Sequence, residues 1–144
     1  MNVPHPVLRR AGSWAMRPGM AAVEFALTAT ILFTLMFGAL EMGRYNMILQ
    51  TASNAAFSAA RTCIVPGATA STGQTAGQNI LSAGLITGGT VSISPATLTT
   101  ATSQVTATVS VPVLSSMWST PVFCGTGTIS KTCTLTTDWT DSAR

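Results

Sequence analysis

Side chains that commonly carry out catalysis are scarce in this chain. Its only histidine is His5, and its acidic residues are Glu24, Glu41, Asp138 and Asp141. Serine and threonine are plentiful, but no base is spaced so as to activate one of them as a nucleophile. Asp138 and Asp141 could be imagined as a carboxylate pair, although a solvated tail is the simpler interpretation. We therefore expect a protein that is not an enzyme and that uses no cofactor.

Glu24 stands apart because it lies in an apolar segment that runs from Met20 to Leu40. As a helix this segment would span about 31 Å, close to the roughly 30 Å hydrocarbon core of a bilayer. An unpaired carboxylate inside that core is energetically costly, so such residues are candidates for function. The simpler alternative is that Glu24 extends its carboxylate to the membrane surface.

A cut between Gly19 and Met20 would give Glu24 a partner. It would create an α-amine at Met20, which is mostly protonated at neutral pH. In an assembly, Glu24 of one subunit could then neutralise the Met20 amine of its neighbour, because a low dielectric strengthens their attraction. Breaking such a pair would leave a buried charge alone, so the pair would select one register between subunits.

The residues before Met20 allow three interpretations. A secretory signal peptide needs a shorter apolar core and a small-residue cleavage site, whereas this core is long and is followed by Glu41-Met42-Gly43. A twin-arginine export signal would use Arg9-Arg10, but Ala11-Gly12-Ser13 lacks the apolar residues expected next. We favour a prepilin-type leader, which is removed on the cytoplasmic side of the apolar segment.

The distribution of charge predicts an orientation and argues against nucleic-acid binding. Arg9, Arg10 and Arg17 precede Met20, so the positive-inside rule predicts a cytoplasmic N-terminus, with everything after Arg44 outside. Only 8% of the residues are charged, against about 25% in an average soluble domain. After these three arginines, the remaining basic residues balance the acidic ones in number, so we expect no basic patch for phosphates.

Helical patterning continues beyond the apolar segment. Apolar residues recur at intervals of three and four, as on one face of a helix, at Tyr45, Ile48, Ala52, Ala55 and Ala59. We predict one helix from about Met20 to Thr62, which Pro66-Gly67 prevents from continuing. Its Ala- and Gly-rich face either lets another helix approach closely or packs on the chain's own outer domain. Glu41 and Arg44 lie one turn apart and are predicted to form an ion pair at the membrane edge.

The remainder of the chain predicts a small α+β domain. Ser71 and Gln74 have the spacing of a capping box, and the pattern that follows predicts a short helix near residues 73–84. Alternating residues predict strands in TVSISP, QVTATVSVPVL and KTCTLTT. Pro112 predicts an edge, or a point where the chain leaves the sheet. We expect a small antiparallel sheet packed on the outer half of the long helix.

Three cysteines in an exported domain predict one disulfide and one remaining thiol. Cys124 and Cys133 flank a short segment with two glycines, and we favour this pair. The alternative joins Cys63 to Cys124 or Cys133 and would tie the helix end to the sheet. We expect no metal site, because the cysteines are widely spaced and His5 lies in the leader.

The stretch GMAAVEF, from Gly19 to Phe25, resembles the processing site of Flp-type prepilins, which have Gly, four residues and then Glu-Phe or Glu-Tyr. Together with GALEMGR and NAAFSAAR, it makes the segment from Arg9 to about Arg61 resemble TadE-like pseudopilins of the tight-adherence (Tad) type IV pilus systems. The later VTATVSVPV is similar to the strand region of that family. One departure is Thr28-Ala29-Thr30, where many relatives have a proline.

The resemblance implies a role for each residue of the GMAAVEF stretch. Gly19 would end the leader and Met20 would begin the mature chain. Glu24 and Phe25 would serve recognition by the prepilin peptidase and subunit assembly. The predicted parts are a cytoplasmic leader at 1–19, a transmembrane and assembly helix at 20–62, and a Ser/Thr-rich exported domain at 63–144.

By the same resemblance, the chain would be a minor pilin that takes part in assembling an adhesive Tad/Flp pilus. Its partners would be the prepilin peptidase, other pilin and pseudopilin subunits, the Tad assembly machinery, and lipid of the bacterial inner membrane. The C-terminal domain would be periplasmic, or extracellular in the pilus. The alternative is an uncleaved single-span anchor whose outer domain binds a surface, a sugar or another envelope protein.

Overall fold

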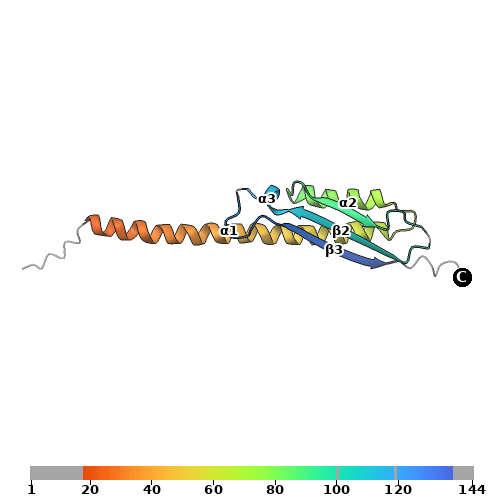
Figure 1. Cartoon of the computed structure of the whole chain (residues 1–144), viewed down its shortest axis with the longest axis horizontal. Helices are drawn as coiled ribbons and strands as arrows, with labels where there is room; N and C mark the ends of the chain where they lie inside the picture. Colours follow the sequence, from red (N-terminus) through yellow and green to blue (C-terminus); the bar gives the residue numbers. More distant parts are fainter. Residues whose placement is uncertain (1–17, 100, 119, 138–144) are drawn as a thin grey trace, which may run out of the picture. The chain divides into compact units, whose positions relative to one another are not determined.

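The structure is a computed structural model that describes residues 18–99, 101–118 and 120–137. The described elements are α1 (Pro18–Cys63), α2 (Ala70–Ala83), β1 (Thr90–Ser94), β2 (Gln104–Pro112), α3 (Val113–Ser116) and β3 (Thr128–Thr136), shown in Figure 1. The described residues up to Met36 and those from Phe37 onward belong to two separate units. The leader arginines, His5, and the pair Asp138 and Asp141 lie outside the described residues.

Helix α1 confirms the prediction of one continuous helix. It begins at Pro18, a first-turn position where proline's missing N–H costs nothing. Thr28, Thr30 and Thr34 donate their hydroxyls to carbonyl oxygens four residues earlier, at 2.8–2.9 Å, so these polar side chains are satisfied within the helix. Among the described residues, α1 is the one helix long and apolar enough to cross a membrane, with a mean hydropathy of 1.9 over an 18-residue stretch.

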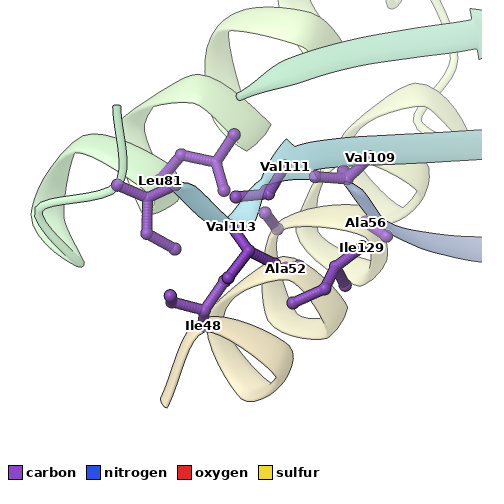
Figure 2. Packing of buried hydrophobic residues seen from close by; sticks show 10 residues of the cluster. Ile48, Ala52, Ala56, Leu81, Val109, Val111, Val113 and Ile129 are labelled. Atoms are coloured by element: carbon purple, nitrogen blue, oxygen red, sulfur yellow. The ribbon is translucent and has the colours of Figure 1, made fainter. Parts of the chain in front are cut away.

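A three-stranded antiparallel sheet in the order β1-β2-β3 packs against α1 and α2. The central strand buries Val105, Ala107, Val109 and Val111, which alternate with hydroxyl-bearing residues on the outer face. Figure 2 shows part of the resulting core, where Ile48 and the small alanines of α1 meet residues of α2 and the sheet. The predicted α+β arrangement is therefore confirmed.

Helix α2 lies unusually close to α1, and glycine makes the approach possible. A β-carbon added at Gly73 would lie 2.1 Å from Sγ of Cys63 and 2.9 Å from the carbonyl oxygen of Ala59. At Gly77 it would lie 3.3 Å from Cβ of Ala59 and 3.0 Å from the nearest methyl carbons of Val91. The small-residue face of α1 is thus covered by α2 and by the sheet of the same chain. This packing does not occupy the other faces of α1.

Hydroxyl groups line the outer face of the sheet. Thr106 lies opposite Thr134, with their hydroxyl oxygens 3.0 Å apart, and Thr108 lies opposite Thr132 at 3.3 Å. Cross-strand hydroxyl pairs of this kind stabilise a sheet modestly. The hydroxyl groups also let this face bind water although it carries no charge. This explains how a segment with no charged residue between Thr62 and Ser130 forms a water-facing surface.

Two local predictions need correction. The N-cap of α2 is Thr69, whose hydroxyl accepts the N–H of Thr72, so the predicted capping box of Ser71 and Gln74 is wrong. The predicted strand that ended at Leu114 is too long, because Val113 and Leu114 begin the short helix α3. Val113 continues the alternating pattern of the strand and is 2% exposed. At Pro112 the second of the two predicted alternatives holds: β2 is the central strand, and the chain leaves the sheet directly after this residue.

Candidate processing and assembly site

The residues predicted to guide processing lie in the first two turns of α1. Gly19 is exposed, and a β-carbon there would meet nothing within 4 Å. Met20 is 76% exposed and Phe25 is 74% exposed. Residues 19–28 are all exposed. Both the peptide bond between Gly19 and Met20 and the side chains beyond it are therefore open to a partner.

Glu24 lies on this exposed part of the helix, one turn beyond Met20. Its backbone carbonyl accepts the Thr28 hydroxyl at 2.8 Å. Among the described residues, none donates a hydrogen bond to its carboxylate. A carboxylate that is exposed within an apolar segment and has no partner among the described residues requires water or another charged or polar group.

The rest of the apolar segment is equally bare. Its large side chains, from Val23 to Leu40, are between 44% and 68% exposed, apart from Phe25 at 74%. A soluble surface helix normally has one polar face. This segment instead presents apolar side chains on all sides, and so requires lipid or other apolar helices around it.

Glu41, directly after the apolar segment, binds backbone and not a cation. Its Oε1 accepts the N–H of Phe123 and the N–H of Cys124, each at 2.9 Å. These donors belong to the connection between β2 and β3, residues 113–127. The ring of Phe123 packs on the preceding turn of α1, where a β-carbon at Gly38 would lie 3.5 Å from its Cε2.

Arg44 holds two further backbone groups. Its Nε donates to the carbonyl of Ser116 at 3.1 Å, and its Nη2 donates to the carbonyl of Leu85 at 3.0 Å. Ser116 ends α3, and Leu85 follows α2 with a left-handed backbone at φ 54°. One guanidinium thereby ties two connections of the outer domain to α1.

The predicted ion pair between Glu41 and Arg44 is therefore not formed. Both side chains project from the same stretch of α1, as the sequence predicted. However, the Glu41 carboxylate accepts hydrogen bonds from backbone N–H groups, and the Arg44 guanidinium donates to backbone carbonyls. Backbone N–H and C=O groups in irregular segments have no strand or helix partner, so they compete strongly for a nearby charge. The two residues, which we call the clamp, instead fix connections of the outer domain to α1.

The predicted disulfide between Cys124 and Cys133 is also not formed, and all three cysteines are free thiols. Cys124 lies beside Glu41, whereas Cys133 lies five residues into β3, opposite Ala107. The backbone of Cys124 is held at α1 by Glu41, and Cys133 is held in the ladder between β2 and β3. Cys63 is fully buried against Gly73.

Burial raises the pKa of the Cys124 thiol, and the negative charge of Glu41 raises it further. Burial likewise raises the pKa of Cys63. Neither thiol is activated as a nucleophile by these surroundings. Among residues 18–99, 101–118 and 120–137, no three of His, Cys, Asp and Glu gather as metal ligands would.

Residues 19–61 match the family model described as TadE-like protein. This segment is TadE-like. The match begins at Gly19, the residue predicted to end the leader, and extends almost to the end of α1. Together with the exposed apolar helix, it indicates a membrane-anchored, pilin-like protein associated with a Tad pilus. No curated protein and no solved structure gives a significant match to the chain.

The TadE-like match does not extend to the outer domain. The contacts that fix the outer domain to α1 were not predicted from the sequence. The packing of Phe123 on Gly38 joins residues far apart in the chain. The only available signal was a glycine in an otherwise bulky apolar segment. No pattern marks the Phe123 and Cys124 amides as partners of Glu41.

Proposed function

We propose that the protein is a TadE-like pseudopilin that a prepilin peptidase cuts after Gly19 and that then takes part in assembling a Tad/Flp type IV pilus for adhesion. The family match from Gly19 to residue 61, over a helix whose Glu24 carboxylate has no partner among the described residues, carries this proposal. The chain acts as a structural subunit and not as an enzyme. Its N-terminus is cytoplasmic, and its outer domain is periplasmic or, in the pilus, extracellular.

The local structure around Gly19 suits cleavage. The scissile bond lies in the first turn of α1, which begins at Pro18. First-turn N–H groups have no partner within a helix, so unwinding this turn breaks few hydrogen bonds. Gly19 has no side chain, and even an added β-carbon would meet nothing within 4 Å, which allows the chain to approach a peptidase closely. Phe25 is exposed and available for recognition.

Cleavage would give Glu24 a charged partner, and the pair would then select the register between neighbouring subunits. The new α-amine of Met20 lies one turn before Glu24 and is positively charged at neutral pH. In a bundle of parallel subunits, pairing between Glu24 of one subunit and Met20 of the next neutralises both charges in a low-dielectric setting. A slipped register would bury both charges unpaired, so the pair selects one alignment.

The first half of α1 is exposed, whereas one face of its second half is buried by the outer domain, and this difference supports the same role. Up to Leu40 the helix is open to lipid or to neighbouring helices, whereas from Ile48 onward one face is buried by its own outer domain. A subunit of this kind can contribute its apolar segment to a helical bundle. The outer domain remains intact on the far side of the membrane.

The test is to express the full chain with and without a prepilin peptidase of a Tad system, and to determine the N-terminal sequence of the product. The expected result is a chain that begins at Met20 only when the peptidase is present. Gly19→Val should block the cut. Glu24→Gln should leave subunits that insert in the membrane but no longer enter pili.

Glu41→Gln is the matched control, because Glu41 is the other acidic residue of α1 and binds its own outer domain. It should leave both cleavage and its dependence on peptidase unchanged. An uncut chain in the presence of active peptidase, together with normal behaviour of Glu24→Gln, would refute the pilin proposal. The protein would then be an uncleaved single-span anchor with an envelope-binding domain.

A further inference from the structure

The exposed apolar side chains of the outer domain gather at one end of it. Among the described residues after Cys63, the large exposed ones are Val65, Leu85, Leu114, Trp118, Val122 and Phe123. All but Val65 lie in or next to the two connections that Glu41 and Arg44 hold. We call Leu85, Leu114, Trp118, Val122 and Phe123 the apolar collar.

Hydrogen bonds fix the collar beside the end of the apolar segment of α1. Arg44 binds the carbonyls of Ser116 and Leu85, which places Leu114 and Trp118 within two residues of an anchored point. Glu41 binds the amide of Phe123, and Val122 immediately precedes it. The Phe123 ring lies on Gly38, which belongs to the apolar segment itself.

The side chains of the collar are strongly exposed and carry no charge. Trp118 is 79% exposed, Val122 is 81% and Leu85 is 77%. No charged side chain occurs between Thr62 and Ser130, so none separates these residues in sequence. Exposed apolar side chains occur singly on most soluble surfaces, but a gathered group marks an interaction site.

Several backbone groups of the same segments bind the two charged side chains of α1. Irregular backbone near hydrocarbon is tolerated only when its N–H and C=O groups are satisfied within the protein. Glu41 satisfies the Phe123 and Cys124 amides, and Arg44 satisfies the Ser116 carbonyl. A water-facing loop needs no such arrangement, because solvent would satisfy its backbone.

We propose that the apolar collar inserts into the interfacial layer of the lipid bilayer beside the exit of α1. The occupant is lipid, because the Phe123 ring of the collar lies against Gly38 of the apolar segment, and because Trp favours the headgroup level. The collar gives the chain a second membrane contact and fixes the depth at which α1 leaves the bilayer. This proposal rests on membrane insertion of α1 and not on cleavage or pilus assembly.

The test uses the full chain with Trp14→Phe and Trp139→Phe, so that Trp118 is the only fluorophore of its type. It is reconstituted in vesicles of phosphatidylcholine and phosphatidylglycerol whose acyl chains carry bromine either near the headgroup or near the chain end. We expect blue-shifted Trp118 emission, protection from aqueous acrylamide, and stronger quenching by the bromines near the headgroup.

Two matched variants give the measurement its controls. A chain with all three tryptophans changed to Phe and with Val65→Trp carries its fluorophore outside the collar, and should show no bromine quenching. Val122→Asp should remove most of the Trp118 quenching, whereas Val65→Asp should leave it unchanged. Far-UV circular dichroism of each variant confirms that it is folded.

Two results would overturn the proposal. Trp118 emission that resembles that of the Val65→Trp chain, with free access for acrylamide, would show that the collar faces water. Blue-shifted emission that is indifferent to brominated lipid would show that protein covers the collar, which assigns it to a contact between subunits.

Discussion

The close packing of α2 on α1 predicts that Gly73→Ala destabilises the outer domain, although most Gly-to-Ala changes within a helix do the opposite. The added β-carbon would lie 2.1 Å from Sγ of Cys63, more than 1 Å inside the roughly 3.5–4.0 Å of a normal contact. Cys63 is fully buried, and the second contact, at 2.9 Å, is to the backbone carbonyl of Ala59. Relief therefore requires α2 to move away from α1.

Two opposing terms set the size of the effect. Replacing glycine by alanine within a helix is worth about 0.5–1 kcal/mol in favour of folding. Overpacking a well-filled interior costs about 1–3 kcal/mol, and here the obstacle includes backbone. We expect a net loss of about 1–2 kcal/mol in the free energy of unfolding. For a domain of this size, each 1 kcal/mol lowers Tm by about 4–8 °C.

The assay is urea unfolding of the full chain in mild detergent, followed by far-UV circular dichroism. Gly43→Ala is the matched control, because Gly43 is also within a helix but a β-carbon there meets nothing within 4 Å. It should be neutral or slightly stabilising. Cys63→Ala combined with Gly73→Ala removes the Sγ contact but not the Ala59 contact, so it should recover part of the loss. If Gly73→Ala behaves like Gly43→Ala, the close helix packing is refuted.

Three further predictions concern the core, the clamp and the membrane segment. Leu81→Ala should reduce the free energy of unfolding by about 2–5 kcal/mol, because Leu81 is 1% exposed within the core, whereas Leu85→Ala, at a 77% exposed position, should change it little in the same urea titration. In a chain with Cys63→Ser and Cys133→Ser, Glu41→Gln should speed alkylation of Cys124 and shift its pH profile downward, since the Glu41 charge raises the pKa of that thiol; an unchanged profile would contradict the clamp. Glu24→Gln should insert in membranes like the unaltered chain but fail to co-purify with other pilus subunits, whereas equal recovery of both chains would show that Glu24 has no part in assembly.

The long helix was predictable because its signals are local. Apolar residues at helical spacing run without a break from the apolar segment to Ala59, and the prediction of Met20 to Thr62 differs from α1 by two residues at the start and one at the end. Strand β2 was predictable for the same reason, because Val and Ala alternate with hydroxyl residues along its length. Periodicity of this kind is dictated by burial on one face.

The errors fall where two nearby groups compete, or where partners are distant in sequence. Thr69 and Ser71 are both good N-cap residues, and the backbone decides in favour of Thr69. Opposite charges one turn apart favour an ion pair, but Glu41 and Arg44 find backbone partners tens of residues away. Spacing alone suggested the Cys124–Cys133 pair, whereas Cys124 lies beside Glu41 and Cys133 lies inside β3, opposite Ala107.

The processing block was recognisable from the sequence because it is contiguous. GMAAVEF carries a small residue, an apolar stretch and a carboxylate within seven positions, and the family match covers it. The apolar collar was not recognisable, because its members come from two connections that meet only in the folded outer domain. Contacts of this kind depend on the fold and leave no local pattern.

The intact mass and N-terminal sequence of the protein, taken unreduced from the membranes of its own cell, give the most direct test of the proposed processing. We predict a chain that begins at Met20, whose α-amine is then available to Glu24. A chain that retains the residues before Met20 would contradict the pilin assignment and leave a membrane anchor with an unexplained carboxylate.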